Sequence, residues 1–226
     1  MADIFERTIT ERCHILLAEY LCRGDTAVDC TCGNGNDTLF LCRSVGPEGK
    51  VFAFDLQEQA ILRTRELLRA EGCEAELFLG SHAALMDTLK DRIVLPADCP
   101  GETDGPEGPA AGYHIPGDRT GEKEDRRRRT APAVIMYNLG YLPGGDHGFT
   151  TRTEETLVSL GQAIKLLKKG GVLSVTAYPG HEEGRREARS VREYLGGLPP
   201  KQFEVISLIQ TNRSPLAPVL HLVHKR

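Results

Sequence analysis

The stretch "AVDCTCGNGNDTLFL", residues 27–41, decides the fold of this 226-residue chain. An apolar lead-in reaches Asp29, the chain then passes Gly33 and Gly35, and a second apolar run begins near Asp37. This pattern is typical of a strand, a tight turn and a helix whose N-terminal N–H groups face a ligand. Glycine is required where backbone approaches a ligand without a Cβ in the way. The alternative is a tight turn that binds nothing.

Outward from this stretch, short β-type runs alternate with helical patterns, which indicates a mostly parallel sheet with helices on both faces. The expected strands are 27–31, 50–56, 75–81, 133–139, 171–178, 203–210 and 218–225, and the expected helices are 8–21, 37–43, 57–71, 153–168 and 182–195. The connection between the last two strands is too short for a crossover helix, so these strands should be antiparallel. We therefore expect one α/β domain spanning residues 1–226.

Residues 96–132 depart from this alternation, because they are rich in proline, glycine and charge and poor in aliphatic side chains. Such a composition is typical of an inserted, flexible loop. Its four arginines, 126–129, either contact phosphates or form a solvated run balanced by the acids just before them.

Composition narrows the class of protein. The net charge of −4 gives no global electrostatic case for nucleic-acid binding, so such binding would depend on a local patch. The N-terminal residues form an amphipathic pattern and not an export signal, and every apolar run is far shorter than the ~20 residues that span a bilayer. Seven cysteines include no C-x-x-C pair. We predict a cytoplasmic protein with reduced thiols, no metal site and no membrane contact.

The ligand of the first turn can be narrowed from three residues. Asp55 follows the glycines by about 20 positions, where an acid commonly accepts hydrogen bonds from ribose hydroxyls. The third glycine of a dinucleotide fingerprint is replaced by Thr38, and Asp29 would repel a diphosphate but attract a cation. S-adenosylmethionine, with its sulfonium and amino group, fits this turn better than NAD.

A second motif, "NLGYLPGG", begins at Asn138, at the carboxyl end of the fourth expected strand. Transfer of a methyl group to an amine requires the nitrogen lone pair to point at the methyl carbon. An Asn oxygen and a backbone carbonyl can accept the amine hydrogens and so orient that lone pair, with the ring of Tyr141 covering the site. The stretch resembles the Asn-Pro-Pro-Tyr motif of amine-directed methyltransferases, with Leu139-Gly140 in place of the prolines. The alternative is an Asn-capped turn.

With "DCTCGNGNDTLFL", "FDLQ", "GSH", "NLGYLPGGD" and "YPGHEEG" taken together, the chain is similar to the small class I methyltransferases known as rRNA methylases. Members of this family act as tRNA 5-aminomethyl-2-thiouridine methyltransferases. The resemblance implies a Rossmann-like, seven-stranded sheet with a C-terminal antiparallel hairpin and helices on both faces. It also implies S-adenosyl-L-methionine as cofactor and N-methylation of the aminomethyl group on the wobble uridine.

The same resemblance implies a set of site residues. The cofactor would be bound by Asp29, Thr31, Gly33, Asn34, Gly35, Asn36, Asp37, Thr38, Asp55, Gln57, Ser81, His82 and Asn138, with Ser81 and His82 flanking the adenine. The catalytic residues would be Asn138, Tyr141 and His181. For His181 three roles stay open: contact with substrate, acceptance of a proton, or capping of the helix that follows.

The implied partner is the tRNA anticodon loop, with the wobble base splayed against Tyr141 and Tyr178. Arg185, Arg189 and Arg192 share one face of an expected helix, and together with Arg186 they could contact phosphates. The alternative for these arginines is a solvated helix paired with its own glutamates. Two rival functions also stay open: methylation of another amine, such as an rRNA base or a protein amide, and a non-catalytic S-adenosylmethionine- or nucleotide-binding module. A homodimer is possible as well.

Overall fold

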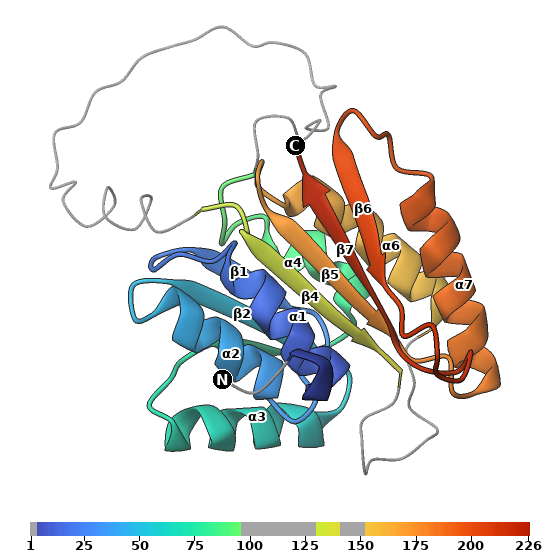
Figure 1. Ribbon diagram of the computed structural model, residues 1–226. Coiled ribbons are helices and arrows are strands. Elements are labelled where there is room, and N and C mark those ends of the chain that lie inside the picture. Colours follow the sequence, from blue (N-terminus) through green and yellow to red (C-terminus); the bar gives the residue numbers. More distant parts are fainter. Residues whose placement is uncertain (1–3, 96–129, 141–151) are drawn as a thin grey trace, which may run out of the picture.

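The computed structural model describes residues 4–95, 130–140 and 152–226, and these build one seven-stranded sheet (Figure 1). In chain order the strands are β1 (Thr26–Asp29), β2 (Lys50–Asp55), β3 (Glu76–Leu79), β4 (Val134–Leu139), β5 (Val172–Ala177), β6 (Phe203–Leu208) and β7 (Val219–Lys225). Their order in the sheet is β3-β2-β1-β4-β5-β7-β6. β7 lies between β5 and β6 and is antiparallel to both, whereas the other pairings are parallel.

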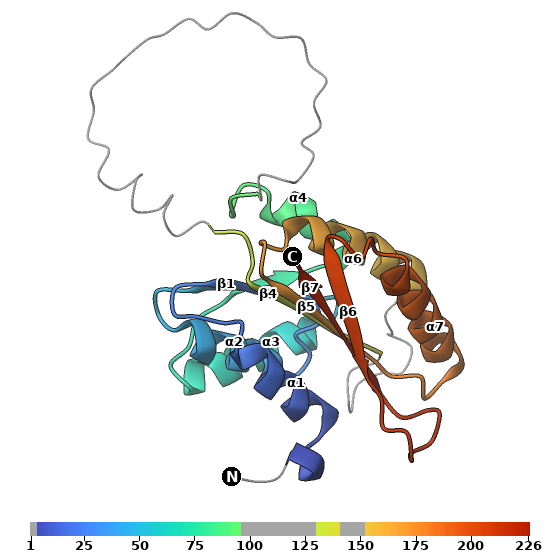
Figure 2. The same ribbon diagram turned by 45° about the horizontal axis from the view of Figure 1, so that its top comes forward.

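The helices form a layer on each face of the sheet (Figure 2). One face carries α1 (Ile9–Ala18), α2 (Asn36–Val45) and α3 (Glu58–Ala70). The other carries α4 (Leu85–Leu89), α6 (Thr153–Leu166) and α7 (Glu182–Gly196). Two short 3-10 helices, η1 (Ile4–Glu6) and η2 (His82–Ala84), precede α1 and α4.

Each face has its own apolar core, because successive side chains of a strand point to opposite faces. Val28 of β1 packs with Leu160 and Val191 from α6 and α7. Its neighbour Ala27 packs instead with Leu17 and Leu41 from α1 and α2. This alternation directs the next odd position, Asp29, toward the α1–α3 face, below the start of α2.

Local sequence explains where α1 and α2 begin. Thr8 accepts a hydrogen bond from the backbone of Glu11, whose side chain bonds back to the Thr8 backbone, so α1 starts with a capping box. Gly35 occupies the N-cap position of α2 with a φ of +84°, a conformation that side chains rarely adopt.

The predicted fold class is confirmed: seven strands, a C-terminal antiparallel strand and five helices lie where the sequence placed them. Several boundaries differ by a few residues, for example β3 and β6 end at Leu79 and Leu208, before the expected residues 81 and 210. Other differences have clearer causes or were not expected at all. The first strand ends at Asp29 and not at residue 31, because the Thr31 N–H turns back to the Asp29 carboxylate. α6 ends at Leu166, and Lys168 forms an ion pair with Asp25 at 2.7 Å. The segments η1, η2 and α4 were not predicted.

The expected insertion at 96–132 lies mostly outside the described residues, and its division from the domain stays a prediction. Within the described part of the chain, none of the helices combines the length and apolar character needed to cross a membrane.

Candidate active site

The carboxyl ends of β1, β2 and β4 form an indented edge of the sheet. β1 stops at Asp29, which is in register with Ala53 of β2 and Met136 of β4. Both neighbouring strands run further, so that Asp55 ends β2 and Asn138 lies near the end of β4. The turn that follows β1 therefore begins in a notch flanked by these two residues. Parallel sheets bind ligands at this end, where the strand order reverses.

The glycine turn is fixed against helix α3. Gly33 and Gly35 have φ values of +54° and +84°, which favour glycine. A Cβ added to Gly35 would lie 2.9 Å from the Cα of Thr64 on α3. The Thr64 hydroxyl donates to the Gly33 carbonyl at 3.3 Å. Contact with α3 thus already requires glycine at position 35, whether or not a ligand approaches it.

Asp29 organises the turn from below. Its carboxylate accepts hydrogen bonds from the Thr31 backbone at 3.1 Å and from the Thr38 hydroxyl at 2.6 Å. Thr38, which stands where a dinucleotide fingerprint has its third glycine, therefore joins the start of α2 to the end of β1. Asp29 is fully buried. Burial, together with the neighbouring Asp37, raises its pKa from 3.8 to about 7.

Asp55 holds the other side of the turn. One carboxylate oxygen accepts the Gly33 N–H and the other accepts the Gln57 N–H, each at 2.9 Å. Burial raises the pKa of this carboxyl. Asp55 remains partly exposed, and each carboxylate oxygen has lone-pair capacity beyond a single backbone bond. Further along the turn, the side-chain oxygen of Asn34 accepts a hydrogen bond from Arg63 at 3.2 Å.

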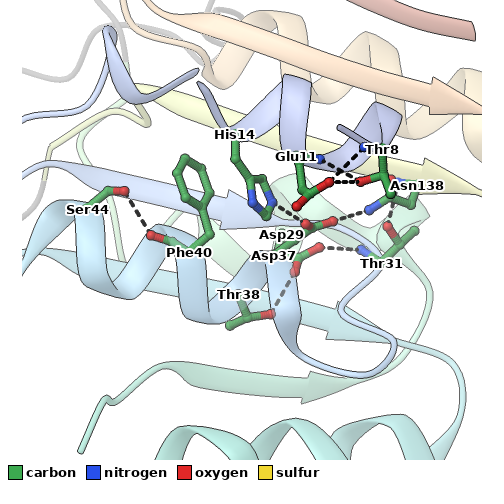
Figure 3. A network of polar contacts seen from close by, with 10 residues as sticks. All are labelled: Thr8, Glu11, His14, Asp29, Thr31, Asp37, Thr38, Phe40, Ser44 and Asn138. Carbon is green, nitrogen blue, oxygen red and sulfur yellow. Dashed lines mark hydrogen bonds and ion pairs between the residues drawn. The ribbon is translucent and has the colours of Figure 1, made fainter. Parts of the chain in front are cut away.

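Asn138 is held from two directions (Figure 3). Its backbone N–H donates to the Thr31 hydroxyl at 2.7 Å, and its side-chain Nδ2 donates to Oδ2 of Asp37 in the first turn of α2. A carboxylate can only accept hydrogen bonds, so this contact fixes which end of the amide is the nitrogen. The Asn138 Oδ1 is then the acceptor that this side chain offers to a substrate.

Helix α1 adds a residue that sequence reasoning did not select. His14 Nε2 lies 2.5 Å from Asp37 Oδ1, and the imidazole stacks on Phe40 with ring centroids 4.1 Å apart and an interplanar angle of 5° (Figure 3). Its signal in the sequence was weak, because one histidine in an amphipathic helix does not reveal a partner 23 positions away.

Ser81 and His82 differ from each other in placement. Ser81 remains at the edge, where its hydroxyl donates to Glu155 of α6 at 2.7 Å. His82 points inward: its ring meets Tyr137 edge-on, with centroids 5.6 Å apart, and burial lowers its pKa to about 4. The role expected of His82, that its ring flanks the adenine, stays a prediction. A polar residue after a strand is ambiguous in sequence, because either face of the sheet can receive it.

The third expected catalytic residue, His181, caps α7. Its Nδ1 accepts the Gly184 N–H at 3.0 Å, which matches the third role considered for it. Nearby, Tyr178 follows β5 and is half-buried, and burial raises the pKa of its hydroxyl. Tyr141 lies outside the described residues, and its role stays a prediction.

The predicted site residues thus divide into groups. Five of them form one hydrogen-bonded cluster at the notch: Asp29, Thr31, Asp37, Thr38 and Asn138. Gly33, Asp55 and Gln57 form a second one beside it. Asn36 is exposed and borders a hollow that His14, Leu39, Phe40, Arg43 and Ser44 also line. His181 belongs to the start of α7.

Cysteine chemistry does not fit this edge. Cys30 and Cys32 are buried, and burial raises the pKa of both thiols, which keeps them protonated and poorly nucleophilic. Among residues 4–95, 130–140 and 152–226, no three acidic, histidine or cysteine side chains converge as a metal would require.

The chain has relatives among known proteins. A family model described as "putative rRNA methylase" matches residues 51–96 and 122–224, and the unmatched residues between fall inside the expected insertion. A chloroplastic tRNA (mnm(5)s(2)U34)-methyltransferase of Arabidopsis thaliana is 33% identical over 222 residues, which are 96% of this chain and 69% of that protein.

Two solved structures extend the comparison. A putative rRNA methylase from Clostridium thermocellum superposes with a TM-score of 0.77 at 31% identity, covering 97% of this chain and 98% of the other. A putative methyltransferase from Streptococcus mutans in complex with SAH has a TM-score of 0.71 at 26% identity, covering 97% and 99%. The cofactor of this chain is S-adenosylmethionine.

The residues at the edge fit that cofactor. Asp29 and Asp37 are two buried carboxyl groups, and burial together with the charge of Asp37 raises the pKa of Asp29, so that a negative charge on Asp29 is disfavoured without a cation. The fixed positive charge of a sulfonium would supply one. Asp55, whose carboxylate is partly exposed, suits the hydroxyls of a ribose. The two sides of the notch thus match the two polar parts of the ligand.

Proposed function

From the premise that the chain belongs to the rRNA methylase family and is an S-adenosylmethionine-dependent methyltransferase, we propose that it methylates tRNA. The substrate is the aminomethyl nitrogen of 5-aminomethyl-(2-thio)uridine at the wobble position. The Arabidopsis relative, whose name specifies a tRNA U34 methyltransferase, supports this substrate.

One observation carries the proposal: the oriented amide of Asn138. The contact with Asp37 commits Nδ2, so Oδ1 is presented as an acceptor beside the notch that suits the cofactor. An acceptor at this place can take a hydrogen of a primary amine and turn the nitrogen lone pair toward the methyl group. A hydroxyl substrate would use the same oxygen less well, because its single hydrogen is lost in the reaction.

The reaction is an in-line displacement in which the cofactor supplies an electrophilic methyl group. The bond from nitrogen to the methyl carbon forms as the bond from that carbon to sulfur breaks, and S-adenosylhomocysteine leaves with the electron pair. An alkylamine is mostly protonated at neutral pH, so it loses one proton to water before attack. The chain contributes orientation of the amine through Asn138, which can account for several kcal/mol of the barrier.

Contacts with RNA would come from the start of α7 and from Tyr178. Arg185, Arg189 and Arg192 are exposed on α7, which begins beside the site at His181. Arg189 pairs with Glu193 at 2.9 Å, an exposed ion pair that a phosphate can replace at little cost. Tyr178 offers a ring next to Gly140: a Cβ added to Gly140 would lie 3.9 Å from the ring atom Cδ2 of Tyr178. These groups supply a local patch on a chain of net charge −4.

The test is mass spectrometry of wobble nucleosides after undermodified tRNA is incubated with enzyme and S-adenosylmethionine. We expect the aminomethyl nucleoside to gain one methyl group. Asn138→Ala should abolish transfer while cofactor affinity stays within about tenfold, because truncation removes an acceptor needed only for the amine. Asn212→Ala, at an exposed asparagine between β6 and β7, serves as the matched control.

Parallel incubations with rRNA and with protein separate the alternatives. Methylation of rRNA in place of tRNA would contradict the proposal. The substrate would then agree with the description of the family and not with the name of the Arabidopsis relative. Cofactor binding without transfer to any of the three would indicate a binding module. Loss of cofactor binding in Asn138→Ala would contradict the role assigned to this amide.

A further inference from the structure

We infer that His14 is a positioning residue for methyl transfer: it holds Asp37, and Asp37 holds the amide of Asn138 in the orientation that presents Oδ1 to the acceptor amine. The inference rests on the proposed function, since it concerns how the same site is built. Three elements meet in this chain of contacts, namely α1, α2 and β4 (Figure 3).

The first step is the geometry around Asp37. His14 Nε2 contacts Oδ1 at 2.5 Å, and Asn138 Nδ2 contacts Oδ2. An ionised carboxylate only accepts, so both partners must donate. Asp37 is buried, which strengthens both bonds relative to water. Because a donor binds each oxygen of Asp37, its carboxylate and the amide of Asn138 are held in a single orientation relative to each other.

The second step is the fixed position of the imidazole. The ring lies parallel to Phe40, with 4.1 Å between centroids. Phe40 belongs to α2, and Ser44 donates to its carbonyl at 2.8 Å within the same helix. Asp37 and Phe40 lie on the same helix, one turn apart, so the stacking and the hydrogen bond orient His14 against a single rigid element.

The third step is what happens when the donor is removed. Asp37 lies close enough to Asp29 that their charges repel. Cys13 and Tyr178 are also near, and neither carries a compensating positive charge. Without the His14 N–H, Oδ1 of Asp37 loses its donor, and of the two contacts from α1 and β4 only the one with Asn138 Nδ2 still holds this side chain. The carboxylate can then rotate, and the amide of Asn138 can turn with it, which moves the amide oxygen away from the substrate.

A role for His14 as a proton acceptor fits the contacts less well. The nitrogen nearest the site is the one committed to Asp37, so its lone pair is not directed at the amine. A positioning residue and a base respond differently to glutamine, whose amide nitrogen can replace histidine Nε2 as a donor but cannot titrate.

The experiment compares His14→Gln with His14→Leu in the full chain, on undermodified tRNA. We expect His14→Leu to lower kcat at least ~10-fold, since small misplacements are costly, while KM and the cofactor Kd stay within about threefold. His14→Gln should stay within about threefold of wild type and keep its pH profile. The same two side chains at the neighbouring exposed position, Ile15→Gln and Ile15→Leu, should change nothing.

Two results would overturn the inference. One is unchanged kcat in His14→Leu. The other is equal loss in both His14 variants with disappearance of one limb of the pH profile, which would make His14 a proton carrier.

A measurement that needs no tRNA substrate separates this inference from the proposed function. The measurement is NMR of the side-chain amide of Asn138 in the cofactor-bound protein, with the signals assigned by their loss in Asn138→Ala. These signals should change chemical shift in His14→Leu but not in His14→Gln. If the wild-type protein methylates no tRNA, the proposed function fails, and the NMR signals alone test whether His14 positions Asn138. Unshifted signals in His14→Leu would then refute the positioning role.

Discussion

Two buried polar clusters lie on opposite faces of the sheet. Two successive residues of β4, Tyr137 and Asn138, belong to different clusters. Asn138 joins the cluster of Asp29, Asp37 and His14 beneath α1 and α2. Tyr137 points the other way and joins a cluster beneath α6, where its hydroxyl lies 2.6 Å from that of Ser159. We call the first the charged cluster. We call the second, to which His82 also belongs, the neutral cluster.

The two clusters differ in charge, and this difference distinguishes a ligand-binding site from a contact that only supports the fold. In the neutral cluster, burial lowers the pKa of His82 and raises that of Tyr137, so both remain uncharged, and Ser159 donates to the His82 carbonyl at 2.8 Å. Hydroxyl and carbonyl groups that bond each other, as those of Tyr137, Ser159 and the His82 backbone do, can be buried at little cost. In contrast, Nδ1 of the buried His82 ring has no hydrogen-bond partner among the described residues. The charged cluster places two carboxyl groups together, which lowers stability unless a cation binds there. Such an arrangement is expected where a cationic ligand is held.

The largest expected effect is on cofactor affinity. Asp29→Asn should raise the Kd for S-adenosylmethionine about tenfold or more, because a sulfonium loses a buried negative charge nearby. Ser159→Ala, in the neutral cluster, should leave this Kd within about twofold. Isothermal titration of both variants measures the contrast. Equal losses in the two would show that the clusters do not differ in the way described.

The pH dependence of stability should have opposite signs for the two clusters. The folded pKa of Asp29 is about 7 against 3.8 for an exposed group, so its proton stabilises the fold at low pH, and this contribution is lost as pH rises from about 4 to 7. The folded pKa of His82 is about 4 against 6.5, so its contribution is full above pH 6.5 and is lost as pH falls toward 4.

Urea unfolding of the cofactor-free protein between pH 4 and 8 tests both signs. Asp29→Asn should remove the component that declines with rising pH, and His82→Phe the component that declines with falling pH. If the two substitutions altered the pH dependence in the same direction, the assignment of charge to the clusters would be wrong.

A smaller effect is expected from Tyr137→Phe. Loss of the hydroxyl removes one bond to Ser159, which keeps its bond to the His82 carbonyl, so the free energy of unfolding should fall by about 1 kcal/mol. The kcat should not change, although Tyr137 is adjacent to Asn138. A marked loss of kcat at constant cofactor affinity would mean that the neutral cluster also positions the site.

The smallest effect on stability is expected at the surface of α7. Arg189→Gln should leave the Tm unchanged, because its ion pair with Glu193 is exposed. It should raise the KM for tRNA about two- to threefold and reduce its salt dependence. Glu193→Gln breaks the same pair from the other side and should not raise this KM. A KM raised equally by both would assign the effect to the ion pair and not to phosphate.

The sequence was sufficient for the fold and for residues at strand ends. Asp29, Asp55 and Asn138 could be found because each closes an apolar run, and the ends of parallel strands meet at one edge. His14 could not be found in this way, since its role depends on how α1 packs over α2. The packing of the His82 ring against Tyr137 was not foreseen either, because the turn after β3 decides which face of the sheet receives the ring. The glycine at 35 was identified, but its contact with Thr64 on α3 was not foreseen.

The position of α1 has a consequence for the order in which the site is completed during synthesis. α1 packs against β5 and β7, so this helix is synthesised well before the strands on which it docks. Domains are synthesised from the N-terminus at roughly 5–20 residues per second. The partners of His14 on α2 are made soon after it, but α1 can take its final place over them only once β5 and β7 have been synthesised and paired. The contact between His14 and Asp37 is therefore completed late, after the glycine turn and α2 have been made.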